Sequence, residues 1–214
     1  MRRHRRLEVV LRTYRNNVER HQRRFRMVTA ATDPRDRDAG VALAAIDVLN
    51  TWSNFARAYW FSAFGTPRTT LGRSITSSRP LVASDPLGFA VLTFRPNAQP
   101  NSYGRWDTRS EPTWHDPQTL LRLTSEAGLS CFADVAAAFS VNSRVFYDLP
   151  VLRNYFAHRN QETYYAALRV APLNSVPTPK RPSEILTSVP ATSTQSLFLN
   201  WLGDFDLVAD YCCA

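Results

Sequence analysis

Residues 41–64 read VALAAIDVLNTWSNFARAYWFSAF, and they give the strongest indication of the fold class. Apolar side chains recur in it at steps of three and four residues, which is the period of one face of an α-helix. We therefore predict a helix over 39–64 that lies at the centre of a helical bundle. Its main stripe comprises Val41, Ala45, Val48, Trp52, Phe55 and Tyr59, and Ile46, Leu49, Ala56, Trp60 and Ala63 widen it.

The same periodicity predicts helices on both sides of this stretch. Upstream, a helix over 7–31 ends at Asp33-Pro34, and Asp36 or Asp38 is suited to cap the next helix. Downstream, Asp116-Pro117 provides a cap and a first-turn proline for another helix. The predicted downstream helices cover 117–128, 130–139, 148–170 and 193–211.

Residues 65–117 differ from the rest because they are rich in proline, serine and threonine and show no helical period. A segment of this length is too long for an ordinary connection between helices. Only residues 89–94, FAVLTF, are typical of a short strand or hairpin. We predict an all-α fold, an up-and-down bundle of four to five main helices with this segment as an insertion. Residues 1–64, 65–117 and 118–214 then belong to one domain.

The composition is that of a globular protein. The chain has 214 residues, of which 44% are hydrophobic and 21% charged. No apolar run approaches the roughly 20 residues that a membrane helix needs, and no apolar signal core follows the basic start. We therefore expect a cytoplasmic protein with no membrane partner. The three cysteines form neither a CxxC pair nor a Cys/His cluster, so a disulfide framework or zinc site is not expected.

The charge is strongly positive, with a net value of +8 and a pI of about 9.9. Lys180 is the single lysine, so nearly all the basic residues are arginines, which favour phosphate contacts. Arginine also accumulates in chains from GC-rich genomes. The charge alone therefore does not distinguish nucleic-acid binding from an effect of genome composition. The N-terminal arginines form either a solvated face or an RNA-facing surface. They are Arg2, Arg3, Arg5, Arg6, Arg12, Arg15, Arg20, Arg23, Arg24 and Arg26.

Residues 152–159 read LRNYFAHR and have the clearest chemical content. At about 100° per residue, Asn154 and His158 lie about 40° apart on one face of a helix. Arg153 lies about 140° from His158, so the two converge most easily if a second copy of the chain completes the site. Glu162, four residues after His158, is placed to orient the imidazole.

These residue types suit the metal-free cleavage of RNA. In that reaction the 2′-hydroxyl attacks the adjacent phosphorus, and the 5′-oxygen leaves with a proton. Histidine titrates near neutrality and can exchange both protons. Arginine stays protonated and stabilises the extra charge of the transition state, while asparagine can hydrogen-bond the phosphate or hold the histidine.

Arg153-Asn154-x-x-x-His158 within an apolar helix, followed by Arg159, resembles the RX4–6H motif of the HEPN superfamily. The resemblance implies a helical bundle that dimerises and brings two motifs together. It further implies a metal-independent endoribonuclease that needs no cofactor, with toxin–antitoxin or antiviral defence as its setting and an antitoxin or defence protein as partner. Arg153 and His158 would be catalytic, supported by Asn154.

Two polar residues of the central helix and one after the motif are further candidates for RNA binding. Asn54 and Arg57 lie either on the outer edge of the helix at 39–64 or on its inner edge, where they would face a functional site. Arg159 directly follows the motif. We predict that all three contact RNA.

Several alternatives stay open. One alternative is that both motif residues have ordinary structural contacts. His158 would then make its hydrogen bonds within the protein, and Arg153 would form a surface salt bridge. A HEPN-like chain can also be a non-catalytic module for RNA binding, nucleotide sensing or dimerisation. The chain lacks a Gly-rich phosphate loop and a GxSxG elbow, which argues against a nucleotide hydrolase and an α/β-hydrolase.

Overall fold

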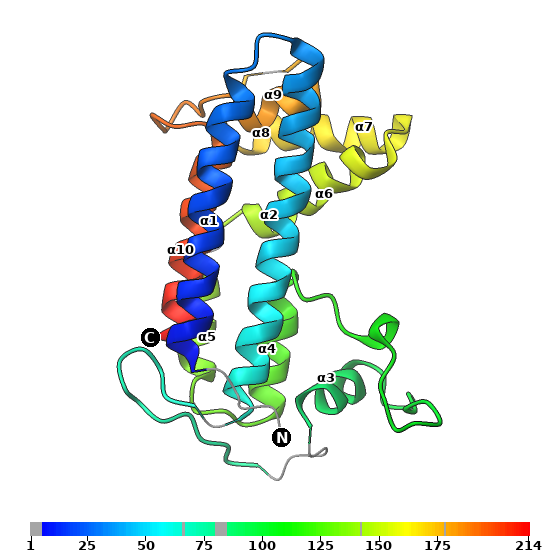
Figure 1. Ribbon diagram of the computed structural model, residues 1–214, viewed down its shortest axis with the longest axis vertical. Coiled ribbons are helices and arrows are strands. Elements are labelled where there is room, and N and C mark those ends of the chain that lie inside the picture. The colour runs from blue at the N-terminus through cyan, green and yellow to red at the C-terminus, as the bar shows by residue number, and fades with distance from the viewer. Residues whose placement is uncertain (1–5, 66, 80–84, 142, 178) are drawn as a thin grey trace. The chain divides into compact units, whose positions relative to one another are not determined.

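The regular structure of this protein is α-helical (Figure 1). The computed structural model describes residues 6–65, 67–79, 85–141, 143–177 and 179–214. Three long helices dominate it: α1 (Leu7–Thr29), α2 (Pro34–Ala63) and α10 (Leu197–Cys213). Within the described ranges there is no β-sheet, only isolated bridges joining Arg68 to Ser74 and Ser77 to Leu129. The predicted all-α fold is confirmed.

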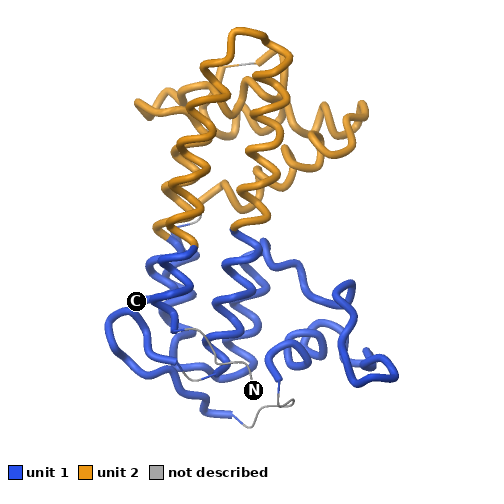
Figure 2. Tube along the Cα trace, in the orientation of Figure 1, with its two compact units in different colours: residues 1–13, 52–141, 208–214 blue, residues 14–51, 142–207 orange. Residues whose placement is uncertain are grey.

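The chain divides into two compact units (Figure 2). Unit 1 comprises residues 1–13, 52–141 and 208–214, and unit 2 comprises residues 14–51 and 142–207. Each unit therefore contains part of α1, α2 and α10. The boundaries expected at 64 and 117 are not boundaries of these units, and the single-domain organisation stays a prediction.

The main apolar stripe predicted for α2 is buried. On α2, the stripe residues Trp52 and Tyr59 are almost fully buried. The turn between the helices differs from the expectation in one detail, because α2 begins at Pro34 and its cap is Asp33. The Asp33 carboxylate accepts the backbone N–H of Arg35 at 2.7 Å, so neither Asp36 nor Asp38 caps the helix.

Besides its part of α2, unit 1 contains short helical segments from the middle of the chain. These are α3 (Pro86–Phe94), the 3₁₀ turn η1 (Thr108–Ser110), α4 (Pro117–Glu126) and α5 (Phe132–Ser140). Trp60 donates its indole N–H to the Pro86 carbonyl at 2.8 Å, and its ring lies 5.6 Å from that of Phe89. The insertion thus contributes a helix to the core of this unit.

The strand or hairpin predicted at 89–94 is wrong, because these residues belong to α3. The physical reason lies just upstream of them. The Asp85 carboxylate accepts the backbone N–H of Gly88 at 2.7 Å, and Pro86 occupies the first turn. A capped N-terminus with a preset proline φ starts a helix, which the apolar run then continues.

Unit 2 contains α6 (Val145–His158), α7 (Gln161–Leu168), α8 (Val170–Leu173) and α9 (Pro182–Thr187). The single helix predicted over 148–170 is therefore wrong. Arg159 adopts a left-handed conformation that ends α6, and Asn160 starts α7. The Asn160 side chain accepts the Thr163 N–H at 2.9 Å while the Asn160 N–H donates to the Thr163 hydroxyl at 3.3 Å. This reciprocal capping box restarts the helix in a new direction.

Candidate functional site

The helix that carries the motif, α6, is anchored at its N-terminal half. Arg144 donates two hydrogen bonds, of 2.8 and 3.0 Å, to the carboxylate of Asp148. Asn174 donates a third at 2.7 Å, and the Asp148 side chain is only 6% exposed. On the same helix Phe146 packs edge-on against Phe205 of α10. The buried carboxylate is therefore fully paired, and it ties α6 to the segment after α8.

The three motif residues lie at the other end of α6, at the surface. Asn154 and His158 are exposed and Arg153 is half-buried. Among the residues that the structure describes, the side chains of all three make no hydrogen bond or ion pair, so neither the salt bridge of Arg153 nor the satisfied histidine is found there. Asn154 and His158 share one helix face, whereas Arg153 projects from another. One chain therefore brings together only two of the three.

Glu162 does not orient His158 in the described structure. The expectation assumed a continuous helix, in which residues four apart are neighbours. Because the chain turns at Arg159 and Asn160, Glu162 instead lies in the first turn of α7, where its side chain is exposed.

Arg159 itself has a backbone conformation that is uncommon for residues other than glycine. Its φ is 46° and its ψ 42°, and its N–H donates to the Tyr155 carbonyl at 2.7 Å. This position caps the C-terminus of α6 and leaves the Arg159 side chain exposed next to His158. The turn therefore presents an exposed arginine at the position that directly follows His158.

Three tyrosines at the same turn were not recognised from the sequence. Tyr155 of α6 lies 5.9 Å from Tyr164 of α7, and Tyr164 lies 5.5 Å from Tyr165, measured between ring centroids. The pair Tyr164-Tyr165 could have been noticed as an aromatic doublet in the sequence. Its contact with Tyr155 depends on the turn at Arg159, which the predicted continuous helix did not contain.

The candidate RNA-binding residues of α2 lie in unit 1, in two different environments. Asn54 is exposed. Arg57 is held by the insertion, since it donates to both carboxylate oxygens of Glu111 at 2.7 and 3.1 Å and stacks over Phe61. Trp114 donates a third hydrogen bond to Glu111 at 2.8 Å. This arrangement assigns Arg57 a structural contact, and its role in RNA binding stays a prediction.

The pKa of Glu111 reflects this network. Burial acts to raise the pKa of the carboxyl, but the hydrogen bonds from Arg57 and Trp114 and the charge of Arg57 outweigh it and lower the pKa below its usual value. Glu111 is therefore ionised at neutral pH and pairs with Arg57 as a carboxylate. The contact joins α2 to a residue 54 positions away in the insertion.

The arginines of α1 divide into paired and unpaired residues in unit 2. Arg15 pairs with Asp206 at 3.1 Å, and Arg24 pairs with Asp47 at 2.8 Å. The remaining three of this stretch are exposed and make no ion pair within the part of the chain that the structure describes. They are Arg20, Arg23 and Arg26. Arg2, Arg3 and Arg5 lie outside the described residues.

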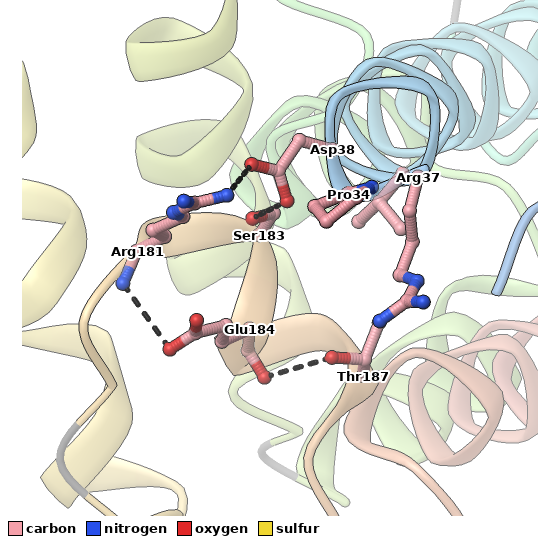
Figure 3. Close-up of a pocket in the computed structure, with 8 residues that line it drawn as sticks. Pro34, Arg37, Asp38, Arg181, Ser183, Glu184 and Thr187 are labelled. Atoms are coloured by element: carbon pink, nitrogen blue, oxygen red, sulfur yellow. Dashed lines mark hydrogen bonds and ion pairs between the residues drawn. The ribbon is translucent and has the colours of Figure 1, made fainter. Parts of the chain in front are cut away.

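One pocket in unit 2 is lined by residues of α2 and α9 (Figure 3). Its volume is about 110 Å³, smaller than the roughly 300 Å³ of a typical small-molecule site. Most of the polar groups shown there are engaged: Asp38 accepts from Arg181 at 2.7 Å and from Ser183 at 2.8 Å, and Arg37 donates to the Ala31 carbonyl at 2.7 Å. The contacts of Asp38 attach α9 to α2, and these interactions leave little for a ligand to bind.

A second pocket, of about 550 Å³, lies in unit 1 and is lined by several hydroxyl groups. Ser77 donates to the Ala127 carbonyl at 2.7 Å and Ser78 to the Gly128 carbonyl at 3.2 Å. Gly128 has a φ of 58°, and a Cβ there would meet the Ser78 hydroxyl at 2.6 Å. The hydroxyls therefore fasten one loop to another, and neither pocket includes the motif.

Comparison with protein-family models, curated proteins and solved structures found no match to this chain. None of the helices, over the described residues, is long and apolar enough to cross a membrane. Over the same residues, no group of three or more His, Cys, Asp or Glu side chains is placed to hold a metal ion.

Proposed function

We propose that this chain is a metal-independent endoribonuclease of HEPN type, in which Arg153, Asn154 and His158 carry the chemistry. One observation supports this most directly: Asn154 and His158 are exposed on one face of α6 and have no protein partner among the described residues. Side chains in that state are available to a phosphate and to water. An asparagine and a histidine that were buried for a structural purpose would instead bond to the protein itself.

The proposed mechanism uses the RNA's own nucleophile. His158 of one motif takes the proton of the 2′-hydroxyl, which attacks the neighbouring phosphorus. Arg153 stabilises the additional negative charge on the phosphate, and Asn154 hydrogen-bonds one of its oxygens. A protonated His158 of the second motif then donates a proton to the departing 5′-oxygen. The products are a 2′,3′-cyclic phosphate and a 5′-hydroxyl.

A homodimer is part of the proposal because one chain does not bring all the groups together. Arg153 projects about 140° away from His158 around the α6 axis. A second copy packed against the exposed end of α6 would place its Arg153 opposite the first His158. We further propose a cytoplasmic setting in toxin–antitoxin or antiviral defence, with an antitoxin or other defence protein as partner.

The test is cleavage of a labelled RNA and of total RNA by the purified protein in EDTA, beside His158→Ala. His115→Ala is the matched control, since His115 lies outside the motif helix. We expect the wild type and His115→Ala to leave cyclic-phosphate ends and His158→Ala to be inactive. Light scattering at micromolar concentration should show a dimer, and a monomer that still cleaves would contradict the shared site.

A second candidate function is a non-catalytic module that binds RNA. The observation that favours it is that Arg153 and His158 project from different faces of α6. A single chain would then offer side chains that can contact RNA but no complete set of catalytic residues. On this alternative, wild type and His158→Ala both bind RNA and neither cleaves it. An inactive His158→Ala that retains RNA binding, beside an active wild type, supports the nuclease instead.

A further inference from the structure

The tyrosine cluster at the α6–α7 turn lies next to the motif, and the proposed chemistry does not use it. Tyr155 precedes His158 by three residues, a spacing that places the Cβ atoms of two helix residues about 5–6 Å apart. Tyr155 in turn contacts Tyr164, and Tyr164 contacts Tyr165. A series of tyrosine rings thus extends from Tyr155, three residues before the candidate catalytic histidine, onto α7.

The rings are both held in place and accessible. Tyr155 packs against the buried Phe156 with a centroid distance of 5.4 Å. Tyr164 donates its hydroxyl to the Lys180 carbonyl at 3.3 Å. Tyr165 completes the cluster, and 52% of its surface is exposed. A ligand that stacks on such a surface loses little free energy in ordering the side chains.

Cationic side chains accompany the rings along the same stretch of chain. Arg153, Arg159 and Arg169 are half-buried or exposed, and in the described parts of the chain their guanidinium groups form no ion pair. Glu162 is the one carboxylate between Arg153 and Arg169. Aromatic rings interleaved with arginines are the chemistry that proteins use for single-stranded RNA, because the rings stack on bases and the guanidinium groups contact phosphates.

We propose that Tyr155, Tyr164 and Tyr165 form a stacking subsite for an unpaired base of single-stranded RNA whose backbone passes His158. This inference rests on the proposed function in taking RNA as the substrate, and it adds a preference for unpaired RNA. A duplex keeps its bases stacked internally and presents phosphates and 2′-hydroxyls, so an aromatic surface gains little from it.

The test is equilibrium binding of a fluorescein-labelled single-stranded RNA of mixed sequence, measured by anisotropy in EDTA. All variants carry His158→Ala so that the probe stays intact. Tyr165→Leu removes the exposed ring, Tyr165→Phe retains it, and Tyr147→Leu is the matched control. Tyr147 also lies in unit 2 and is 54% exposed, but at the far end of α6.

We expect Tyr165→Leu to weaken binding of the single strand by about 5- to 150-fold, the range for loss of one base–aromatic stack. Tyr165→Phe and Tyr147→Leu should bind within about twofold of the parent variant. The same RNA annealed to its complement should bind equally to all variants. Melting temperatures establish that each variant is folded.

Two results would overturn the inference: an unchanged affinity of Tyr165→Leu for the single strand, or an equal loss with Tyr147→Leu. A change of oligomeric state in Tyr165→Leu with unchanged RNA affinity would assign the tyrosines to a protein interface instead, and it would equally overturn the inference. The proposed nuclease is judged separately. If wild type does not cleave RNA but binding depends on the Tyr165 ring, the subsite stands and the nuclease falls.

Discussion

Arg159 directly follows His158, and its left-handed backbone, with a φ of 46°, ends the motif helix at the histidine. Glycine occupies this conformation without steric cost, whereas a side chain adds strain. An arginine at such a position stores a small amount of strain beside the candidate catalytic residue, which is a frequent feature of functional sites.

We therefore expect Arg159→Gly to raise the free energy of unfolding by about 0.5–1 kcal/mol. It relieves about 1–2 kcal/mol of left-handed backbone strain, and the greater flexibility of glycine in the unfolded chain offsets roughly half of that gain. If Arg159 contacts a phosphate, as predicted, the same substitution should also weaken RNA binding. Urea unfolding and anisotropy measure the two effects. Arg159→Ala is the control, with the same loss of RNA affinity and no gain in stability. A lower stability for Arg159→Gly would mean that the Arg159 side chain itself stabilises the turn.

The Arg57–Glu111 pair gives a prediction for the insertion. Removing either side chain should lower the free energy of unfolding by about 1–3 kcal/mol, the usual range for hydrogen bonds to charged groups. The double variant should lose less than the sum, because both single changes break the same contact. If Arg57 also binds RNA, as predicted, Arg57→Ala will weaken RNA binding while Glu111→Ala will not. Equal RNA affinities for the two variants and wild type would leave Arg57 with its contact to Glu111 alone.

The unpaired arginines of α1 test whether this helix is an RNA-facing surface. Each phosphate contact with a single strand contributes about 0.7 to the slope of log affinity against log salt. Replacing Arg20, Arg23 and Arg26 together by glutamine should therefore reduce the slope by about 2. The matched control replaces the paired Arg15 and Arg24. If the triple variant and wild type have equal slopes of log affinity against log salt, these three arginines contact solvent and not RNA.

His21 provides a pH dependence. It contacts the Thr51 hydroxyl at 2.8 Å, and burial, opposed by the charge of Asp47, lowers its pKa from the usual 6.5. The unfolded chain then binds more protons than the folded chain as pH falls below 6.5. This contribution to stability is complete above that value and declines below it.

The measurement is the melting temperature at pH 7.5 and pH 5.5, for wild type and for His21→Gln. Glutamine can still hydrogen-bond Thr51 but does not titrate. We expect wild type to lose more stability on acidification than His21→Gln does. If the two lose the same amount, His21 is as easily protonated in the folded chain as in the unfolded chain.

Apolar periodicity and capping residues predicted most of the helices. The same kind of capping residue was present where the prediction was wrong. An aspartate followed by proline starts three helices, at Asp33-Pro34, Asp85-Pro86 and Asp116-Pro117. We recognised it as a helix start only at Asp116. At Asp85 the following apolar run was short enough to resemble a strand, and periodicity alone does not separate the two.

The candidate site was predictable only in part. The motif lies within a helix, as predicted, but the helix ends at His158 because of a conformation that arginine rarely adopts. The tyrosine cluster follows from that turn. The contact of Arg57 with Glu111 joins residues 54 positions apart and depends on how the insertion packs, which no local pattern encodes.

All three cysteines are buried, and burial raises the pKa of the Cys131 and Cys212 thiols. Thiolate is the form that reacts with maleimides and methanethiosulfonates, so the native chain should label slowly with either reagent. A cysteine introduced at an exposed position would then react selectively without removal of the natural ones. Spin or fluorophore labels can therefore be attached at a chosen position in the natural background. A label on a cysteine that replaces Tyr147 would report the distance between the two motif helices of the proposed dimer.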